Sequence, residues 1–443
     1  MLSVLKNRTY RHLLSAQIIA LIGTGLASVA LGLLAYDIAG GNAGAVLGTA
    51  LAIKMVAYIG IAPIIGAYAD RLPRRRFLIA MDVIRAGVAL ALPFVDQIWQ
   101  VYVLIFALQS ASAAFTPTFQ ATIPDVLPDE ADYTRALSLS RLAYDLENLL
   151  SPILAAALLT VIGFHWLFAG TSVGFVISAL FVLSVVLPMS PAKPQIGSVY
   201  ARTTRGIRAY LKTPRLKGLL AITFAAAAAS SMVIVNTVVI VREMFGLGQR
   251  EVALTLAAYG GGSMLAAFIL PRLLDQLSDR KVMLFAATAL SAGLGIMAAA
   301  FASGFASWPV VLTGWMVLGI AYSMSVTPSG RLLKRSAGDS DRPAIFAAQF
   351  ALSHAAWLLC YPLAGQIGAA FSQSAAFAVL TAVAALGTVA AALLWPGADP
   401  EVVPHDHKDL PPDHPHMREA HKGGQSAAHA FVIDDLHPQW PRN

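Results

Sequence analysis

Charged residues and cysteine are both scarce in this chain. Only 12% of its 443 residues are Asp, Glu, Lys or Arg, and 57% are hydrophobic, which excludes an ordinary soluble protein. The single cysteine, Cys360, has no second cysteine to bond, so an intrachain disulfide is impossible. The sequence also lacks a G-x-x-x-x-G-K-[ST] loop. This absence excludes an ATP-driven pump with that signature, and we expect no enzyme.

Long apolar stretches, by contrast, fill the chain up to residue 395. A membrane-spanning helix needs about 20 mostly apolar residues, and the sequence before residue 396 divides into twelve such spans. The first span follows basic residues and shows no small-residue cleavage site, so we expect it to be retained. Because basic residues favour the cytoplasmic side, both termini are expected there. The sequence therefore predicts an all-α, multi-pass protein of a bacterial inner membrane.

Changes in composition divide the chain into four parts. Basic and apolar residues alternate in the connection between the sixth and seventh spans, a pattern typical of an amphipathic helix on the inner leaflet. We expect a six-helix bundle over 1–188, a cytoplasmic linker over 189–215, a second bundle over 216–395 and a cytoplasmic tail over 396–443. The net charge of +7 does not indicate nucleic-acid binding, because topology already explains basic residues at span ends. The expected macromolecular environment is the lipid bilayer.

One polar stretch joins the second and third spans: Gly66-Ala-Tyr-Ala-Asp70-Arg71-Leu-Pro-Arg74-Arg75-Arg76. Each charge at the bilayer centre would cost a few kcal/mol, so this stretch is expected to form a short aqueous turn. The pattern G-x-x-x-D-R-x-x-R-R between two membrane helices resembles the signature between helices two and three of the major facilitator superfamily of transporters. Pro73 stands where that signature usually has glycine. The resemblance implies a gating motif that comprises Gly66, Asp70, Arg71, Arg74 and Arg75.

The second half of the chain repeats the first. Asp275, Thr327-Pro328 and Tyr361-Pro362 match Asp70, Thr116-Pro117 and Ser151-Pro152 at offsets of about 205 to 211 positions. Two pseudo-symmetric six-helix bundles with a substrate path between them follow from this repeat and from the resemblance. Such a protein would transport its solute by rocking one bundle against the other.

Details of the spans suggest a branch of this superfamily. In the fourth span, Gln109-Ser110 lacks the arginine of the R-x-x-Q-G motif that many drug-proton antiporters carry, and Ser151-Pro152 lacks the usual glycines. The turn, the linker and the Asp82-x-x-Arg85 pair look more like the branch that contains siderophore exporters and nickel and cobalt efflux carriers. This resemblance favours a nickel-resistance type of carrier.

Polar residues inside the spans are candidates for the proton and substrate pathway, because each needs a partner or a wet cavity. The predicted set is Lys54, Gln109, Asp145, Glu147, Asn236 and His354. Some of these have alternative roles. Asp145 is four residues from Arg141, so the two can pair on one helical face, and His354 can be a core histidine that bonds a neighbouring helix. Lys54 can neutralise an acid or bind an anionic solute.

The tail is rich in histidine and poor in apolar residues, so we expect it to be largely disordered. The candidate metal ligands there are His405, His407, His414, His416 and His421. Imidazole suits nickel, copper, zinc and cobalt, and several weak sites on a tether would concentrate metal at the cytoplasmic mouth. Alternatively, these histidines are incidental in a solvated tail. Metal binding would be transient, and no resident cofactor is expected.

These observations predict a monomeric secondary transporter that exports a divalent metal, nickel or cobalt, in exchange for protons taken up through Glu147 or His354. An exporter of an organic solute, such as a siderophore or an amphipathic drug, is the alternative. A third possibility is a metal sensor whose membrane part no longer transports.

Overall fold

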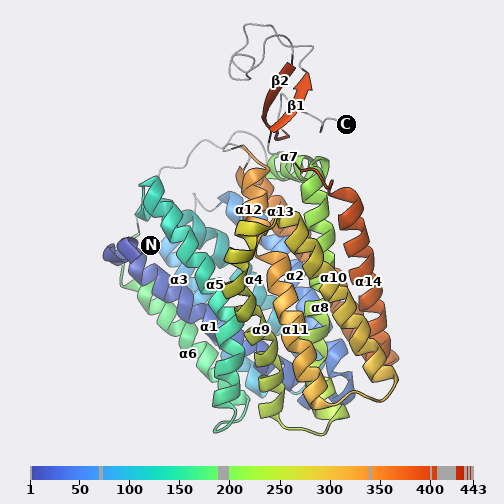
Figure 1. Ribbon diagram of the computed structural model, residues 1–443. Helices are drawn as coiled ribbons and strands as arrows, with labels where there is room; N and C mark the ends of the chain where they lie inside the picture. The colour runs from blue at the N-terminus through green and yellow to red at the C-terminus, as the bar shows by residue number, and fades with distance from the viewer. Residues whose placement is uncertain are drawn as a thin grey trace.

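The computed structural model describes residues 2–68, 73–187, 199–338, 342–399, 402–406, 426–433, 437 and 440. Long helices run side by side and form the body of the protein, and two short strands lie outside it beyond α7 (Figure 1). The all-α architecture predicted from the apolar spans is confirmed.

The first group of helices covers the amino-terminal half. Asn7 caps α1 by accepting a hydrogen bond from the backbone N–H of Tyr10 at 3.0 Å, and Asp129 caps α5 in the same way through Asp132 at 2.9 Å. These short polar side chains satisfy N–H groups that have no partner within the helix. The elements are η1 (Leu2–Lys6), α1 (Arg8–Ala39), η2 (Gly40–Asn42), α2 (Ala43–Tyr68), α3 (Arg74–Ala91), η4 (Leu92–Phe94), α4 (Ile98–Val126), α5 (Glu130–Leu158) and α6 (His165–Leu183).

The second group begins at α8, where Pro214 occupies the first helical position, a site that tolerates its missing N–H. It comprises α8 (Pro214–Val239), the π-helical turn η5 (Ile240–Met244), α9 (Gln249–Gln276), α10 (Asp279–Ala302), α11 (Trp308–Val326), α12 (Ser329–Arg335), α13 (Arg342–Ala370) and α14 (Gln373–Leu394). Helix α7 (Val199–Lys212) precedes this group and lies within the expected linker.

Helix α7 packs on α13 of the second group. A Cβ atom at Gly206 would overlap the backbone of Ala344, so the two helices touch there. The Tyr210 hydroxyl donates a hydrogen bond to the side chain of Gln349. Burial raises the pKa of Tyr210, which keeps this hydroxyl protonated as a donor.

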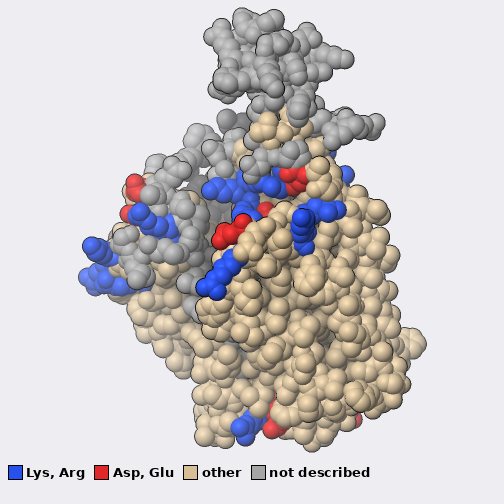
Figure 2. Space-filling model, viewed as in Figure 1, with Lys and Arg blue, Asp and Glu red and all other residues tan. Residues whose placement is uncertain are grey.

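Ten helical segments in the described part of the chain are long and apolar enough to cross a membrane. The first of them, 8–65, contains both α1 and α2, whereas α5 is not among the ten. Lys and Arg side chains gather at the end that carries α7 and α12 (Figure 2). Twelve spans and cytoplasmic termini remain predictions, which this distribution of basic residues supports.

The internal repeat is visible in two ion pairs at the end of the molecule that carries α7 and α12. Arg74 at the start of α3 pairs with Asp125 at the end of α4. In the second group, Asp279 at the start of α10 accepts a hydrogen bond from Nε of Arg331 at 3.0 Å. The two ion pairs occupy equivalent places with their charges exchanged.

A second pair of equivalent hydrogen bonds joins α3 to α6 in the first group and α10 to the end of α14 in the second. Arg75 of α3 donates to the carbonyl of Leu183 at the end of α6. Arg280 of α10 donates to the carbonyl of Trp395, just beyond α14, at 2.8 Å. Both halves therefore use an arginine at the same place to cap the carboxyl end of a helix.

Glycines allow close approach between some helices. A Cβ atom at Gly365 of α13 would overlap the carbonyl oxygen of Gly44 in α2, so these helices from different groups touch through their backbones. Within the second group, Gly262 of α9 lies against the carbonyl oxygen of Met316 in α11. Gly319 of α11 lies against the carbonyl oxygen of Tyr259 in α9.

The described part of the tail contains a pair of strands, and the expectation of a largely disordered tail stays a prediction. Strands β1 (Val402–Asp406) and β2 (Ser426–Ala430) pair antiparallel, with Val402 opposite Ala430. Val403, Phe431 and Ile433 are buried in a small cluster that also contacts Ala209 of α7. The tail is therefore docked on α7 at these residues.

Candidate functional site

The first feature of the site is a stack of side chains between α2 and α13. Lys54 and Tyr58 are four residues apart and share one face of α2, and Nζ of Lys54 lies 6.0 Å from the centroid of the Tyr58 ring. The Tyr58 ring stacks on His354 with centroids 5.4 Å apart, and His354 lies 4.0 Å from the ring of Phe350. Nδ1 of His354 donates to the carbonyl of Phe350 at 2.7 Å, which leaves Nε2 to accept a proton.

Glu147 approaches this region from α5. Its Cγ would be 3.5 Å from a Cβ atom at Gly25, and Ser151 would overlap that atom, so α5 reaches α1 only because residue 25 is glycine. The carboxyl group of Glu147 and the ammonium of Lys54 interact through space. No ion pair or hydrogen bond joins them in the described part of the chain. The two charges thus face each other without direct contact.

Gln109 lines a pocket enclosed by helices of the first group. The pocket also contains Lys54, Thr24, Ser28 and Ser112, and it offers about 20 Å³ to the centre of a water molecule, which is room for about one water. The predicted pathway residues Lys54 and Gln109 are therefore brought together. In this conformation the pocket does not hold a large solute.

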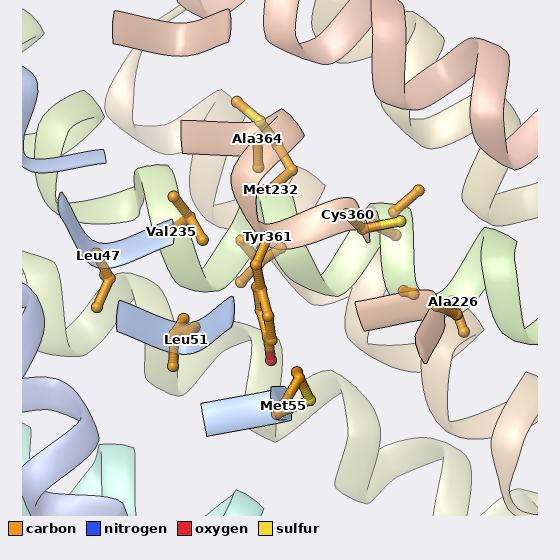
Figure 3. Packing of buried hydrophobic residues seen from close by; sticks show 14 of the residues in the cluster. Leu47, Leu51, Met55, Ala226, Met232, Val235, Cys360, Tyr361 and Ala364 are labelled. Carbon is orange, nitrogen blue, oxygen red and sulfur yellow. The ribbon is translucent and has the colours of Figure 1, made fainter. Parts of the chain in front are cut away.

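Tyrosines supply the second group's side of the site. The rings of Tyr259 in α9 and Tyr322 in α11 lie 5.7 Å apart, and Tyr361 of α13 is close enough to interact electrostatically with both. Figure 3 shows the Tyr361 ring extending past Leu51 toward Met55 of α2. Tyr361 thus lies against an apolar face of the first group, and the other two tyrosines lie near it within the second group.

Sequence analysis did not identify Tyr58, Tyr259 or Tyr322. The spacing of Lys54 and Tyr58 on one helical face is a signal that identifies the first. No comparable signal exists for Tyr259 and Tyr322, since their contact depends on how α9 and α11 pack.

The other predicted pathway residues lie elsewhere. Asn236 is fully buried and donates to the carbonyl of Ala364 at 2.9 Å, so it ties α8 to α13. It is not among the residues that line the pocket. The side chain of Asp145 is outside the described part of the structure, and its pairing with Arg141 stays a prediction.

The gating motif is described only in part. Gly66 lies in α2, whereas Asp70 and Arg71 are outside the described residues. Arg74 and Arg75 bond to Asp125 and to the carbonyl of Leu183, both within the first group. A role in gating stays a prediction.

Metal binding by the tail also stays a prediction. His405 lies in β1, and His407, His414, His416 and His421 are outside the described residues. Among the residues that are described, no group of three or more His, Cys, Asp or Glu side chains is arranged to hold a metal ion.

Comparison with known proteins identifies the family. The family model described as Major Facilitator Superfamily matches residues 13–248 and 219–431, which together cover most of the chain. The chain belongs to the Major Facilitator Superfamily. Its membership of this superfamily is what the G-x-x-x-D-R-x-x-R-R turn led us to expect.

Curated relatives of this major facilitator protein match over part of their length. An uncharacterized MFS-type transporter, YfiS, of Bacillus subtilis is 23% identical over 282 residues, 61% of this chain and 65% of that protein. Macrolide efflux protein A of Enterococcus faecalis is 28% identical over 152 residues, 32% of this chain and 47% of that protein. Multidrug resistance protein MdtG of Serratia proteamaculans is 28% identical over 162 residues, 36% and 39% of the two chains. The matched region thus spans less than two thirds of each relative.

Solved structures support the fold. The nucleoside transporter NupG matches with a TM-score of 0.65 and 14% identity, over 87% of this chain and 98% of that one. A D-xylose-proton symporter matches with a TM-score of 0.61 and 17% identity, over 89% and 97%. The expected branch with siderophore exporters and nickel and cobalt carriers is not supported, because the named relatives carry out macrolide or multidrug efflux.

Proposed function

We propose that this protein exports an amphipathic organic solute across a bacterial inner membrane by alternating access, in exchange for protons taken up at Glu147. The observation that carries the proposal is the site between the two groups, where Tyr58 stacks on His354 and Lys54 lies near both Tyr58 and Glu147. Relatives named for macrolide and multidrug efflux support the direction of transport and the organic nature of the solute.

The chemistry of this site favours an organic solute over a metal ion. Phenol and imidazole rings offer flat apolar surfaces and a few hydrogen-bonding atoms, which suits a partly aromatic solute. Nickel and cobalt would need several nitrogen, oxygen or sulfur ligands around one point, and no group of three or more such side chains occurs among the described residues. The organic exporter, expected as the alternative, therefore replaces nickel or cobalt as the proposed substrate class.

Contacts between the groups suggest which end of the path is closed. At the end remote from α7, Gly44 and Gly365 touch through their backbones, and the Tyr36 hydroxyl donates to Glu243 at 2.7 Å. The guanidinium of Arg242 lies 5.1 Å from the centroid of the Tyr36 ring. Solute release at that end requires these contacts to separate, as expected for bundles that rock about a central site.

Transport in inside-out membrane vesicles tests the proposal. An imposed proton gradient, acid inside, should drive accumulation of a fluorescent amphipathic dye such as rhodamine B by the wild-type protein. Glu147→Gln should abolish the dependence on the gradient, because an amide cannot carry the proton. Asp96→Asn removes an exposed carboxylate outside the helices and is the matched control, which should retain gradient-driven uptake.

Gradient-independent uptake by the wild-type protein, or full coupling in Glu147→Gln with normal protein levels, would contradict the assignment of the proton to Glu147.

A further inference from the structure

The pocket in the first group presents two hydrogen-bond donors that have no acceptor. Lys54 of α2 and Gln109 of α4 line it, and neither has a hydrogen-bond partner within the described residues. Gln109 is only 8% exposed, and its amide opens onto the pocket, since it is not among the fully enclosed polar groups that lack a partner. The hydroxyls of Thr24 and Ser28 already donate to backbone carbonyls of α1. Lys54 and Gln109 are therefore the side-chain donors that this pocket offers to an acceptor of a bound solute.

Glu147 supplies the opposite charge nearby. Its position against Gly25 places it beside the same part of α1 that contributes Thr24 and Ser28 to the pocket. It interacts with Lys54 through space but forms no direct ion pair with it in the part of the chain that is described. The ammonium of Lys54 and the carboxylate of Glu147 thus lie in the same region of the first group without forming an ion pair.

A solute with one charge satisfies only half of this arrangement. An anion bound at Lys54 leaves the carboxylate of Glu147 without a counterion, and a cation bound at Glu147 does the same to Lys54. An unpaired charge away from water is strongly unfavourable. A solute with both charges compensates both groups and keeps the site neutral.

We propose that Lys54, Gln109 and Glu147 form a dipolar subsite for a zwitterionic amphipathic solute. Lys54 and Gln109 hold the carboxylate of the solute, and Glu147 holds its ammonium group. The carboxylate enters the pocket by displacing the water for which there is room, and the apolar body lies toward Tyr58 and His354. This inference rests on the proposed export function and names the class of its substrate.

The subsite also explains how a proton and the solute exclude each other. Among the described side chains, the titratable and charged groups around this space are Lys54 and Tyr58 from α2, Glu147 from α5 and His354 from α13. Among the pocket residues of α1 and α4, none is charged. A proton on Glu147 removes the attraction for the ammonium of the solute and leaves Lys54 positive. Solute therefore leaves where protons enter, which is the requirement for exchange.

Three indole compounds with the same skeleton test the charge requirement. L-Tryptophan is a zwitterion, L-tryptophanamide is a cation and N-acetyl-L-tryptophan is an anion. In inside-out vesicles with an acid interior, we expect accumulation of tryptophan at least 10-fold above that of the other two. Lys54→Gln should remove the preference for tryptophan over tryptophanamide. Glu147→Gln is compared with the wild type by binding of the indoles to purified protein, because it no longer responds to the gradient, and it should lose the preference for tryptophan over N-acetyltryptophan. Lys54→Arg keeps the positive charge and should retain the preference for tryptophan over tryptophanamide.

The outcomes separate this inference from the proposed function. Gradient-driven uptake of rhodamine B together with equal uptake of the three indoles would overturn the dipolar subsite and leave the export function standing. If neither the dye nor any of the three indoles accumulates in vesicles that contain folded protein, both the dipolar subsite and the export function would be overturned.

Discussion

The imidazole ring of His354 lies parallel to the phenol ring of Tyr58, with centroids 5.4 Å apart and planes inclined by 11°. This stack joins α13 to α2 and therefore the second group of helices to the first. It also places a titratable nitrogen beside the ammonium of Lys54, which approaches the same phenol ring. This pair of rings therefore contains a titratable nitrogen and also forms a contact between the two groups of helices.

Loss of the Tyr58 ring should weaken solute binding. A stacked aromatic pair contributes about 0.5–1.5 kcal/mol beyond its burial, so Tyr58→Leu should raise the KM for dye transport by about 2- to 10-fold. Initial rates in vesicles over a range of dye concentrations measure this change. Tyr58→Phe retains the ring and should raise KM less. An unchanged KM in Tyr58→Leu would show that the stack does not contribute to the site.

A methyl group at Gly365 should prevent closure of the end remote from α7. Because a Cβ atom there overlaps the carbonyl oxygen of Gly44, Gly365→Ala should slow transport and expose Ala45, whose Cα would be 3.2 Å from the new atom. The measurement is the rate at which a water-soluble maleimide labels Ala45→Cys in a Cys360→Ala background. Gly60→Ala is the control, because a Cβ atom at Gly60 meets nothing within 4 Å. Equal labelling rates in the two variants would refute the close contact.

Exchange of the charges of Arg74 and Asp125 should be tolerated. Asp125→Arg alone places two arginines together and should destabilise the protein by about 2 kcal/mol or more. The double variant Arg74→Asp, Asp125→Arg reproduces the arrangement of Asp279 and Arg331. It puts an acid at the start of α3 and a base at the end of α4, which the helix dipoles favour. Thermal unfolding of the purified protein should show recovery to at least the wild-type midpoint, and a double variant no more stable than the single one would contradict the equivalence.

Phe431 should hold the tail on α7. Its side chain is buried, its carbonyl accepts from Arg215 at 3.2 Å, and its ring lies 5.0 Å from that of Trp440. Truncation of a buried Phe to Ala costs about 3–5 kcal/mol, so Phe431→Ala should lower the equilibrium constant for docking at least 100-fold. Limited proteolysis of residues 426–433 should then be faster. Val402→Ala is the control, since Val402 is 52% exposed, and equal cleavage of the two variants would exclude docking through Phe431.

The sequence allowed the architecture and three central residues of the site to be predicted, for physical reasons. Charges are so costly in hydrocarbon that the turn around Asp70 marks the end of a span, and the same cost singles out Lys54, Glu147 and His354. The structure places these three near one another. Asn236 is also polar and within a span, yet its amide donates a hydrogen bond to the carbonyl of Ala364. Composition alone does not distinguish such a structural residue from a residue of the candidate site.

Other features depend on contacts between distant parts of the chain. Tyr259 and Tyr322 belong to different helices of ordinary apolar character, so only packing shows that their rings meet. The pairing of β1 with β2 joins segments separated by a long polar stretch, and neither segment alternates in polarity. The expectation of nickel or cobalt came from the resemblance to one branch of the superfamily and from the tail histidines, which lie far along the chain from the candidate site.

The backbone contacts at Gly262 and Gly319 determine how α9 and α11 move. With no side chain between them, neither helix can slide along the other without forcing a carbonyl oxygen into an α-carbon. The two helices are therefore expected to move together as one rigid pair. Under the proposed mechanism, Tyr259 and Tyr322 are carried on this pair and keep a constant spacing when the groups rock. The second group would then present these two rings to a solute as one preformed surface.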